Sequence, residues 1–600
     1  MTLQSRNATI KRVREEGWGL RGTIAEELAS DSPSFSAENV RLLRHHGIFQ
    51  QDNRDERHQW RERAFGRRYD FMVRIRASGG KLTARQLRGI LRLADEHGDG
   101  RVRITSRQGL QLQGIEKSSL GPVIRRIMEL GLTTLATGGA LNCNVMCCPA
   151  PRRHDRVHEQ LQSTADGISA RLMCYLAAYE EIWLGERSLK RHQTGSGNST
   201  GHHAKSPDGE SLLPHKFKVA LATPQDNCTD IYAQDIGLLA MTNSGRIAGY
   251  NVLVGGGMGT ILGVKSRQPA LAQPLAFINS RDLLPLVSAI VRVYREFGDR
   301  SDRAKARMRY LIENWGLDRF KRVVEQCFGR SLQPPRQLEV VGYEDHLDWH
   351  PQKNGDWYLG IHVDVGSILD TDQYCLKSAL REIIDRFDCD IRLTPQQNIL
   401  LCGIKPAERR EIESVLDRHS IPSAGLLSNI RRSAMACPGL PKCNSAITKS
   451  DRTLPGLVDA LETEIERLGL TDLPFTIRVT GCPIGCTRAY LADIALVGRT
   501  MDRRTRQEKL AIFVGGDTLG HRLNVLYKDL VPADQIISTL RPLLRYYKID
   551  RHPAESLGCF WHRKGIDDLK RFANEAASED ATQEHPARPH QVDGDPCQGE

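Results

Sequence analysis

The sequence predicts an α+β fold with a pseudo-twofold duplicated architecture. Residues 71–115 have the pattern of a strand, a glycine turn, a helix and a second strand, and residues 357–404 repeat this order. An internal repeat of this kind predicts two similar halves with a site where they meet. Chance similarity between two βαβ units is the alternative.

The first repeat can be followed element by element. The segment FMVRIRAS is typical of a strand, Gly79–Gly80 of a turn, residues 84–98 of a helix and residues 101–115 of a returning strand. The second repeat aligns with the first at these positions: Phe71 with Trp357, Gly80 with Gly366, Arg103 with Arg392, Gln108 with Gln397, and Gly114 with Gly403. We therefore expect both units to follow the same backbone course.

The segments outside the repeats differ in composition. Residues 1–69 are polar and charged, which indicates an extended or helical arm rather than a domain. The loop LNCNVMCCPAP after the first repeat is followed by an amphipathic helix with these residues on one face: Val157, Leu161, Ile168, Leu172 and Tyr175. Residues 194–211 are a low-complexity loop, a linker surrounds Pro334–Pro335, and the polar residues from about 577 onward indicate a disordered tail.

Two short cysteine pairs near the C-terminal end carry the strongest chemical signal. Five residues separate Cys437 from Cys443, and three separate Cys482 from Cys486. Four thiolates on proline- and glycine-rich turns fit a Cys-ligated iron–sulfur cluster. Zinc sites favour closer pairs, a disulfide framework does not suit a large chain without a secretory signal, and unrelated buried cysteines are a third alternative. The loop after the first repeat lacks this paired spacing, so one cluster is expected.

Composition limits the class of protein. The chain has 600 residues, a hydrophobic fraction of 40% and no apolar run as long as a membrane span. The N-terminus has no apolar signal core and the fifteen cysteines suit a reducing compartment, so we expect a cytoplasmic protein. The net charge of +11 is compatible with nucleic acid, an acidic protein partner or a polyanionic cofactor. The basic residues are dispersed, which makes nucleic acid the weakest of the three.

Several motifs, in order along the chain, resemble the sirohaem- and iron–sulfur-dependent sulfite and nitrite reductases. They are LRGTIAEELA, LLPHKFKVAL, GYNVLVGGGMG, FGDRSDRAKARMRYLIE and TGCPIGCTRAYLADIALVG, together with the duplicated unit and the paired cysteine loops. The resemblance covers about residues 19–575, and CPGLPKCNSAI is closer to the sulfite than to the nitrite version of that loop.

The resemblance implies two ferredoxin-like half-domains plus two α/β lobes that bind sirohaem and an Fe–S cluster. The expected parts are an N-terminal arm (1–69), the half-domains (70–135 and 350–410), a first sirohaem- and substrate-binding lobe (136–330), an Fe–S and sirohaem-binding lobe (425–575) and a disordered tail (577–600).

The resemblance also implies the cofactors and the residues that hold them. A 4Fe–4S cluster would be held by Cys437, Cys443, Cys482 and Cys486, and Cys486 would be shared with the sirohaem iron. The macrocycle, which is rich in carboxylates, would be contacted by Arg107 with Gln111 on the same strand face, with hydrogen bonds from Thr105 and from the amides of Gly255, Gly256 and Gly257. Taken alone, the glycine run fits any tight turn.

Three cations match the positions that face the substrate anion in the family: Arg76, Lys216 and Lys218. The alternation in HKFKV places both lysines on one side of a strand, with Phe217 opposite. Two lysines on a strand are commonly a solvated face. The apolar VALA that follows favours a buried strand, where a lysine needs an anion.

The sequence departs from the family near the expected anion site. Asn142-Cys143-Asn144-Val145 stands where the family usually has Asn-Arg-Asn-Val. Losing this charge-assisted contact would cost about 2–4 kcal/mol, or roughly 30- to 1000-fold in transition-state stabilisation. Cys143, at a candidate catalytic position, is a thiol facing the haem, an alternative ligand or a benign neighbour. Ile484 replaces a common asparagine, and TILGVKSR after Gly259 lacks a polar pattern of the family.

The leading hypothesis is an assimilatory sulfite reductase that converts sulfite to sulfide with six electrons from a small acidic ferredoxin. No flavin or nicotinamide fingerprint occurs, so the electrons come from a separate protein. Nitrite reduction to ammonia is the second hypothesis. A sirohaem protein whose reductase activity is impaired at Cys143 is the third.

Overall fold

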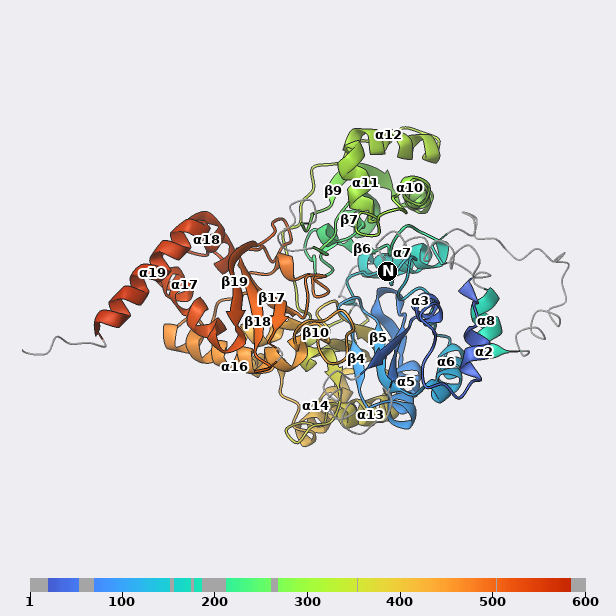
Figure 1. Cartoon of the computed structure of the whole chain (residues 1–600), viewed down its shortest axis with the longest axis horizontal. Helices are drawn as coiled ribbons and strands as arrows, with labels where there is room; N and C mark the ends of the chain where they lie inside the picture. Colours follow the sequence, from blue (N-terminus) through green and yellow to red (C-terminus); the bar gives the residue numbers. More distant parts are fainter. Residues whose placement is uncertain are drawn as a thin grey trace, which may run out of the picture.

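A computed structural model describes residues 20–52, 69–151, 156–173, 177–185, 212–260, 268–352, 354–502 and 504–583. Figure 1 shows the two repeats in the lower middle of the molecule, one lobe above them and another to the left. The upper lobe follows the first repeat in the chain, and the left lobe follows the second. The described residues form four sheets with helices packed on them, so the α+β class is confirmed.

The repeats build the first two sheets and exchange one strand each. The first sheet has the order β1 (Ile48–Asp52), β2 (Tyr69–Ile75), β5 (Leu110–Ile115), β4 (Val102–Ile104) and β12 (Ser367–Ile368). The second has the order β10 (Asp348–Pro351), β11 (Trp357–Ile361), β14 (Ile399–Ile404), β13 (Asp390–Leu393) and β3 (Lys81–Thr83). The exchange is reciprocal, because Ser367 of β12 lies opposite Arg103, and Lys81 of β3 lies opposite Arg392.

Equivalent residues of the two repeats share uncommon backbone conformations, which confirms the duplication. Gln108 and Gln397 have φ values of 53° and 69°, in the left-handed region that non-glycine residues rarely adopt. Their side chains make reciprocal hydrogen bonds: Gln108 Nε2 donates to Leu393 O at 3.0 Å, and Gln397 Nε2 donates to Ile104 O at 3.1 Å. Each repeat therefore closes its turn against the other.

Four helices complete the repeats: α5 (Ala84–His97), α6 (Leu120–Glu129), α13 (Leu376–Arg386) and α14 (Arg409–Arg418). α5 begins at a capping box in which Thr83 Oγ1 accepts from the Gln86 amide and Gln86 Oε1 accepts from the Thr83 amide. Its apolar residues, spaced at helical intervals, pack with those of α13 in one hydrophobic core. The repeats thus fold as one unit.

The two lobes share a second, equivalent topology. The upper lobe contains β6 (Val219–Ala222), β7 (Ile236–Asn243), β8 (Arg246–Val254), β9 (Gln273–Asn279), α7 (Val157–Arg171), α10 (Leu283–Phe297), α11 (Met308–Trp315) and α12 (Leu317–Phe328). The left lobe contains β15 (Met435–Ala436), β16 (Ile477–Thr480), β17 (Ile494–Met501), β18 (Glu508–Val514), β19 (Val525–Pro532), α15 (Asn429–Ser433), α16 (Ser450–Leu468), α17 (Ile536–Asp550), α18 (Leu557–Lys564) and α19 (Ile566–Gln583). β6–β7 and β16–β17 are parallel pairs, each followed by antiparallel strands.

The ends of the chain differ from the sequence-based expectation. The arm contributes α2 (Ile24–Leu28), α3 (Asn39–Leu43) and β1, which pairs with β2 and is therefore part of the first sheet. Helix α19 continues to Gln583, past the expected start of the tail at about 577. A further helix, α8, spans Ala177–Leu184. Tyr175, the low-complexity loop at 194–211 and residues 584–600 lie outside the described residues.

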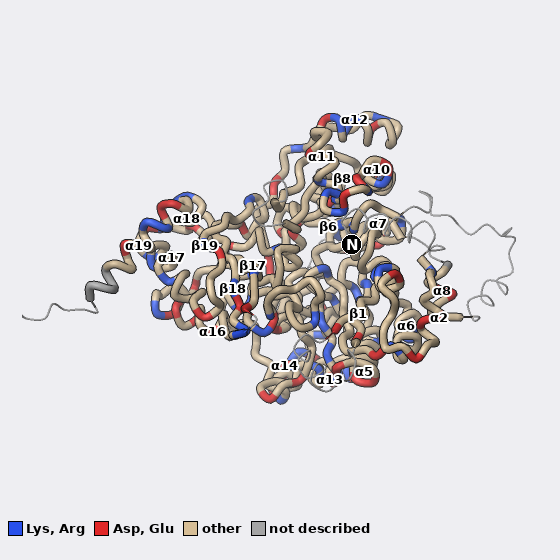
Figure 2. Tube along the Cα trace, in the orientation of Figure 1, with Lys and Arg blue, Asp and Glu red and all other residues tan. Residues whose placement is uncertain are grey.

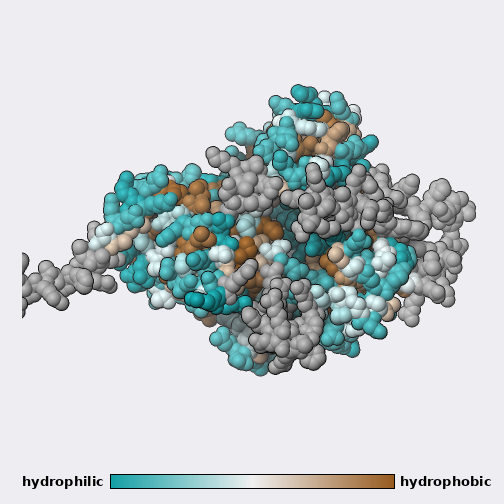
Figure 3. Space-filling model, viewed as in Figure 1, coloured by the Kyte–Doolittle hydropathy of each residue, from teal (hydrophilic) through white to brown (hydrophobic). Residues whose placement is uncertain are grey.

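Helix hydropathy and the distribution of surface charge can be read for the described residues. Within the described ranges, no helix is both long enough and apolar enough to cross a bilayer. The face in Figure 3 is mostly hydrophilic, with hydrophobic residues in separate small groups. On the described parts of the chain in Figure 2, acidic and basic residues are mixed along the outer helices rather than gathered in one basic stripe.

Candidate active site

The two cysteine pairs lie in loops that follow two parallel strands of the left lobe. Cys437 comes directly after β15, and Cys482 follows β16. Because β15 and β16 are parallel neighbours, their carboxyl ends lie at the same edge of the sheet. The Gly481 amide donates to Cys437 Sγ at 3.2 Å and links one loop to the other. A Cβ at Gly481 would lie 2.8 Å from Thr448 O, so glycine permits this approach.

The four thiols of these loops interact electrostatically. Cys437 and Cys482 are 8% and 6% exposed, Cys443 is half-buried and Cys486 is exposed. Burial raises the pKa of Cys437, Cys443 and Cys482, that of Cys482 to about 12, and the neighbouring Cys486 raises each further. Thiolates so close together need a metal charge among them. This donor set fits the iron–sulfur cluster that the sequence predicts.

A polar row on the first sheet faces the cysteine loops. Gln111 of β5 lies opposite both Arg74 of β2 and Arg103 of β4. With its Oε1 turned toward Arg74, Gln111 accepts from Nε and Nη2 at 3.1 Å each. Arg103, 1% exposed, donates to Ala436 O at 3.0 Å and pairs with Asp451 Oδ2 at 3.1 Å. Gln111 thus positions Arg74 beside the cysteines. The expected strand face shared by Gln111 and Arg107 is not observed, because Arg107 lies in the β4–β5 turn.

Buried and half-buried cations gather around Cys143, beside the cysteine loops. Arg76 is 4% exposed and donates to Asn142 O at 3.0 Å, and Arg107 donates to Gln234 Oε1 at 2.8 Å. Burial lowers the pKa of each arginine to about 10, and the Cys143 thiol is the first neighbour that opposes this shift. The Nε atoms of both arginines are buried without a hydrogen-bond acceptor in the described residues.

Lys218 belongs to the same group of cations. Burial, and then Lys216 and Arg107, lower its pKa well below the usual range of a lysine. Phe217 between the lysines stacks on Tyr294, with ring centroids 5.5 Å apart, in the core of the upper lobe. The predicted alternation is therefore confirmed at Phe217. β6 begins one residue after Lys218, and the backbone here also pairs with the loop that carries Cys143.

The cationic group has little compensation from carboxylates. Arg307 forms an ion pair with Asp235 at 2.8 Å. Burial lowers the pKa of Arg307, but the Asp235 carboxylate more than offsets this effect, so the pKa is raised overall. Among the residues that the structure describes, Arg76, Arg107 and Lys218 have no carboxylate within ion-pair distance. A group with this excess of positive charge, in which Arg76 is buried and Arg107 and Lys218 are half-buried, fits a bound polyanion.

Three of the groups expected to contact the cofactor make hydrogen bonds inside the protein. Thr105 Oγ1 accepts from the amides of Arg107 at 3.3 Å and Gly109 at 3.1 Å, so it closes the β4–β5 turn. The amides of Gly255 and Gly257 donate to the carbonyls of Asp235 and Ala270, respectively. The Gly255 and Gly257 amides are therefore already engaged, whereas cofactor hydrogen bonds donated by the Thr105 hydroxyl and the Gly256 amide stay predictions.

The glycine loop has a structural reason for its composition. A Cβ at Gly256 would lie 2.3 Å from Tyr232 O and 2.5 Å from Gln234 O, so only glycine fits. Arg309 fixes the following turn by donating to Gly257 O at 2.8 Å and to Gly259 O at 2.8 Å. Residues 261–267, which hold most of TILGVKSR, lie outside the described part of the chain.

Contacts between the lobes join the two sets of residues. Asp230 of the upper lobe pairs with Arg478 Nη1 at 2.8 Å and also with Arg488, and all three are at most 3% exposed. Ser106 Oγ donates to Cys486 O at 2.8 Å. The Thr260 amide donates to Pro483 O at 3.0 Å. The β4–β5 turn, the glycine loop and the second cysteine pair therefore meet at one place.

Sequence reasoning missed several members of this site. Arg74 alternates with Arg76 on β2, and this spacing alone would have placed both on one face. Arg307 and Arg309 lie in FGDRSDRAKARMRYLIE, whose residues were not assigned roles. Nothing in the sequence indicates that Asp230 crosses to the other lobe, because the contact spans 248 positions to Arg478.

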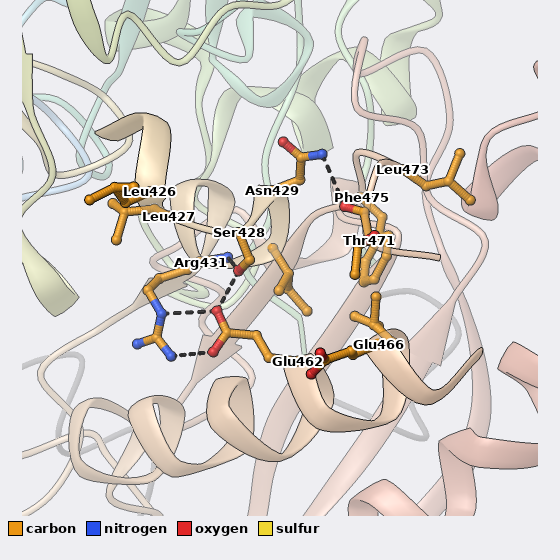
Figure 4. A pocket seen from close by; sticks show the side chains of 12 residues that line it. Leu426, Leu427, Ser428, Asn429, Arg431, Glu462, Glu466, Thr471, Leu473 and Phe475 are labelled. Atoms are coloured by element: carbon orange, nitrogen blue, oxygen red, sulfur yellow. Dashed lines mark hydrogen bonds and ion pairs between the residues drawn. The ribbon is translucent and has the colours of Figure 1, made fainter. Parts of the chain in front are cut away.

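The left lobe also contains a cavity away from these residues. Its volume is about 360 Å³, and it is lined by residues near the starts of α15 and β16 and along α16, including Leu426, Arg431, Glu462 and Phe475. Figure 4 shows Arg431 held by Glu462 at its wall. None of the site residues predicted from the sequence lines it, so it is not the candidate active site.

Comparisons with known proteins agree with this arrangement. The Nitrite/Sulfite reductase ferredoxin-like half domain matches residues 66–130 and 350–419, and the Nitrite and sulphite reductase 4Fe-4S domain matches residues 164–332 and 428–580. The chain is 38% identical to a Sulfite reductase [ferredoxin] of Synechococcus elongatus over 92% of this chain and 88% of that protein. It is 36% identical to a Sulfite reductase [NADPH] hemoprotein beta-component of Myxococcus xanthus over 93% and 96% of the two chains.

A solved structure has the same fold. The Mycobacterium tuberculosis NirA protein superimposes with a TM-score of 0.75 at 24% identity, covering 93% of this chain and 96% of that one. Sirohaem and a 4Fe–4S cluster are the cofactors implied by the matched domains and by the sulfite reductase relatives. The chain belongs to the nitrite and sulfite reductase family of oxidoreductases.

Proposed function

We propose that this protein reduces sulfite to sulfide with six electrons supplied by ferredoxin. The observation that carries the proposal is the juxtaposition of four thiols with a partly buried group of cations that few carboxylates compensate. The thiols suit a cluster that delivers electrons, and the cations suit the anions that receive them. The relative from Synechococcus elongatus supports the ferredoxin assignment.

The residues divide between the two cofactors. Cys437, Cys443, Cys482 and Cys486 would hold the 4Fe–4S cluster, with Cys486, the exposed thiol, shared with the sirohaem iron. Arg107 and the neighbouring arginines would bind macrocycle carboxylates, since the unpartnered Nε of Arg107 is a buried donor. When bound, the coupled cofactors supply the redox chemistry.

Arg76, Lys216 and Lys218 would bind and orient the substrate anion. Lys218 is the best proton carrier of the three, because its lowered pKa eases loss of a proton to the departing oxygens, which leave as water. Arg76 keeps its charge and holds the anion in place through its buried guanidinium.

Cys143 determines how efficient this site is. Its side chain is 6% exposed and lies among the cations, where the family usually has another arginine. The remaining cations still make an anion site with Cys143 in place. We therefore propose a working reductase with weaker transition-state stabilisation rather than a protein that has lost the reaction.

The electron donor and the substrate can be tested together. Purified protein would be assayed with sulfite and with nitrite, using reduced ferredoxin or an NADPH-dependent flavoprotein as donor. We expect the highest kcat/KM with sulfite and ferredoxin, and an association rate with ferredoxin that falls steeply with salt. Preference for nitrite would overturn the substrate, and preference for the flavoprotein or a salt-independent rate would overturn the donor.

A further inference from the structure

A second group of metal-binding side chains lies in the upper lobe, away from the paired cysteines. Cys148 Sγ, Cys228 Sγ, an Asp226 carboxylate oxygen and a His346 ring nitrogen all lie within 4.8 Å of one another. The four residues are at most 2% exposed. They come from three separate segments: the loop after the first repeat, the β6–β7 connection and the linker to the second repeat.

We propose that this cluster is a structural zinc site in which Cys148, Cys228, His346 and Asp226 are the four ligands. Two thiolates, an imidazole and a carboxylate are ligand types that Zn²⁺ prefers. Because all four positions come from buried protein side chains, no position is left open for substrate, as is typical of a structural site.

Two of the separations between ligand atoms are close to the edges of a tetrahedron around zinc. Zinc–ligand bonds of about 2.0–2.3 Å give tetrahedron edges of roughly 3.3–3.8 Å. His346 Nε2 lies 3.1 Å from Asp226 Oδ2 and 3.6 Å from Cys148 Sγ. The side chains therefore need little movement to hold an ion.

The surroundings hold the ligands in orientation. Asp226 Oδ1 accepts from the amides of Cys228 at 3.0 Å and Glu344 at 3.2 Å, which leaves Oδ2 turned toward His346. The other ring nitrogen of His346, Nδ1, has no hydrogen-bond partner among the described residues, and the Glu344 carboxylate lies 3.8 Å away, beyond hydrogen-bond distance. His346 also has a φ of 61°, a conformation that is rare for a non-glycine residue.

Backbone hydrogen bonds fix the three segments to one another. The Asn227 amide donates to Gly342 O at 3.0 Å, and the Val341 amide to Pro224 O at 2.7 Å, which ties the linker to the β6–β7 connection. The Met146 amide donates to Val219 O at 3.1 Å, which ties the first loop to β6. The ligands are thus brought together before an ion binds.

Without an ion, the charges of the four side chains would be poorly balanced. Burial lowers the pKa of His346, but Cys148 and Asp226 more than offset this and raise it well above the usual range. Burial raises the pKa of Cys228, and the Cys148 thiol raises it further. A divalent ion would replace the shared protons and neutralise the anionic ligands.

The duplication provides independent support. Val219 pairs with Ile236 as Ile477 pairs with Ile494, and Met146 pairs with Ala220 as Met435 pairs with Arg478. These registers make Cys148 the equivalent of Cys437 and Cys228 the equivalent of Cys486.

The two β-strand connections also have matching hydrogen bonds. The Asp230 amide donates to Asn227 O, and the equivalent Arg488 amide donates to Gly485 O. Asp230 and Arg488 share positive φ values of 51° and 56°. The cluster therefore occupies, in the upper lobe, the place that the paired cysteines occupy in the left lobe, with Asp226 and His346 completing the ligand set.

The test measures metals in the full-length protein, purified with its cofactors from zinc-supplemented cells and exchanged into EDTA. We expect about one zinc per chain in the wild type, at least about tenfold less in Cys228→Ser and in Asp226→Asn, and no loss in the buried-cysteine control Cys402→Ser. Cys437→Ser should lose iron and keep zinc, which separates this proposal from the proposed function.

Spectroscopy of the wild type covers the case in which the variants fail to fold. Zinc-edge X-ray absorption should show two sulfur ligands at about 2.3 Å and two nitrogen or oxygen ligands at about 2.0–2.2 Å. Wild-type protein with almost no zinc, zinc retained in Cys228→Ser, or a Cys148–Cys228 disulfide found by peptide mapping would each overturn the proposal.

Discussion

In the upper lobe, Cys148 and Cys228 lie in a closed, fully buried cluster, whereas in the left lobe their equivalents Cys437 and Cys486 belong to a wider set of four thiols. The backbone around the two places is the same, as the strand registers show. In the left lobe Cys486 is exposed, whereas in the upper lobe the linker that carries His346 packs over the cluster.

The two lobes therefore offer equivalent sites on the same strand scaffold, and the loop side chains determine what each site can bind. Four thiolates spread over two loops suit a cluster of several irons that passes electrons to a neighbour. Two thiolates with a histidine and an aspartate, packed tightly, suit one redox-inactive ion. A single duplicated fold can therefore carry a redox centre in one half and a structural centre in the other.

The largest effect should come from removing a thiol of the left lobe. Cys482→Ser deletes a buried cluster ligand, so we expect turnover to fall more than the about 10–100-fold typical of losing an outer partner of a metal ligand. Steady-state assay of sulfite reduction measures this, with Cys402→Ser as the matched control. Full activity in Cys482→Ser would contradict the assignment of a four-thiol cluster to the left lobe, because the fourth thiol would then not be needed.

Removing Lys218 should have the next largest effect. Lys218→Met keeps most of the volume but deletes a charge from the anion site, and the loss should be roughly 100-fold in kcat/KM for sulfite. Lys218→Arg should retain more activity, since it keeps the charge. Equal activity of Lys218→Met and wild type would show that the cations serve the macrocycle alone.

Restoring an arginine in the first loop should have the opposite effect. Cys143→Arg adds a charge-assisted contact to the anion, and we expect kcat/KM to rise about 30-fold, the lower end of what such a contact contributes. Cys143→Ser, which adds no charge, is the control. An unchanged or lower rate in Cys143→Arg would mean that the thiol has its own role.

The pH dependence of anion binding should be smaller but diagnostic. Burial, and then Lys216 and Arg107, lower the pKa of Lys218 in the free protein, and a bound anion raises it again. Binding then takes up a proton, so affinity is constant below the lowered pKa and falls as pH rises above it, by up to about tenfold per unit.

Nitrite is the suitable probe, since it stays ionised throughout the neutral range. Spectroscopic titration of wild type and Lys218→Gln gives the two profiles, and the variant should be nearly flat. A wild-type affinity that does not change with pH would remove Lys218 from the anion site.

The repeats could be predicted from the sequence because local chemistry specifies them. Gly80, Gln108 and Gly114 align with Gly366, Gln397 and Gly403, and all six have positive φ. The exchange of β3 and β12 between the two sheets could not be predicted from the alignment, because the exchange depends on how the two repeats pack together. The same limit applies to Arg103, whose partners Ala436 and Asp451 lie more than 330 positions away.

The candidate site was predictable where residues recur in short patterns. The cysteine pairs and the alternating lysines are of this kind, and Phe217 turns into the core as its alternation requires. The Gly255 and Gly257 amides differ because backbone hydrogen bonds inside the protein engage them, and only folded coordinates reveal such bonds. His346 joins Cys148 across 198 positions, so no spacing could have indicated the second cluster.

The most direct test of the account is an iron and acid-labile sulfide count on wild type, Cys486→Ser and Cys228→Ser. We expect about five irons per chain in the wild type, four from the cluster and one from sirohaem, with about four labile sulfides. Both should fall sharply in Cys486→Ser and stay at the wild-type level in Cys228→Ser. Iron that survives the Cys486 replacement, or zinc bound between the four left-lobe thiols, would contradict it.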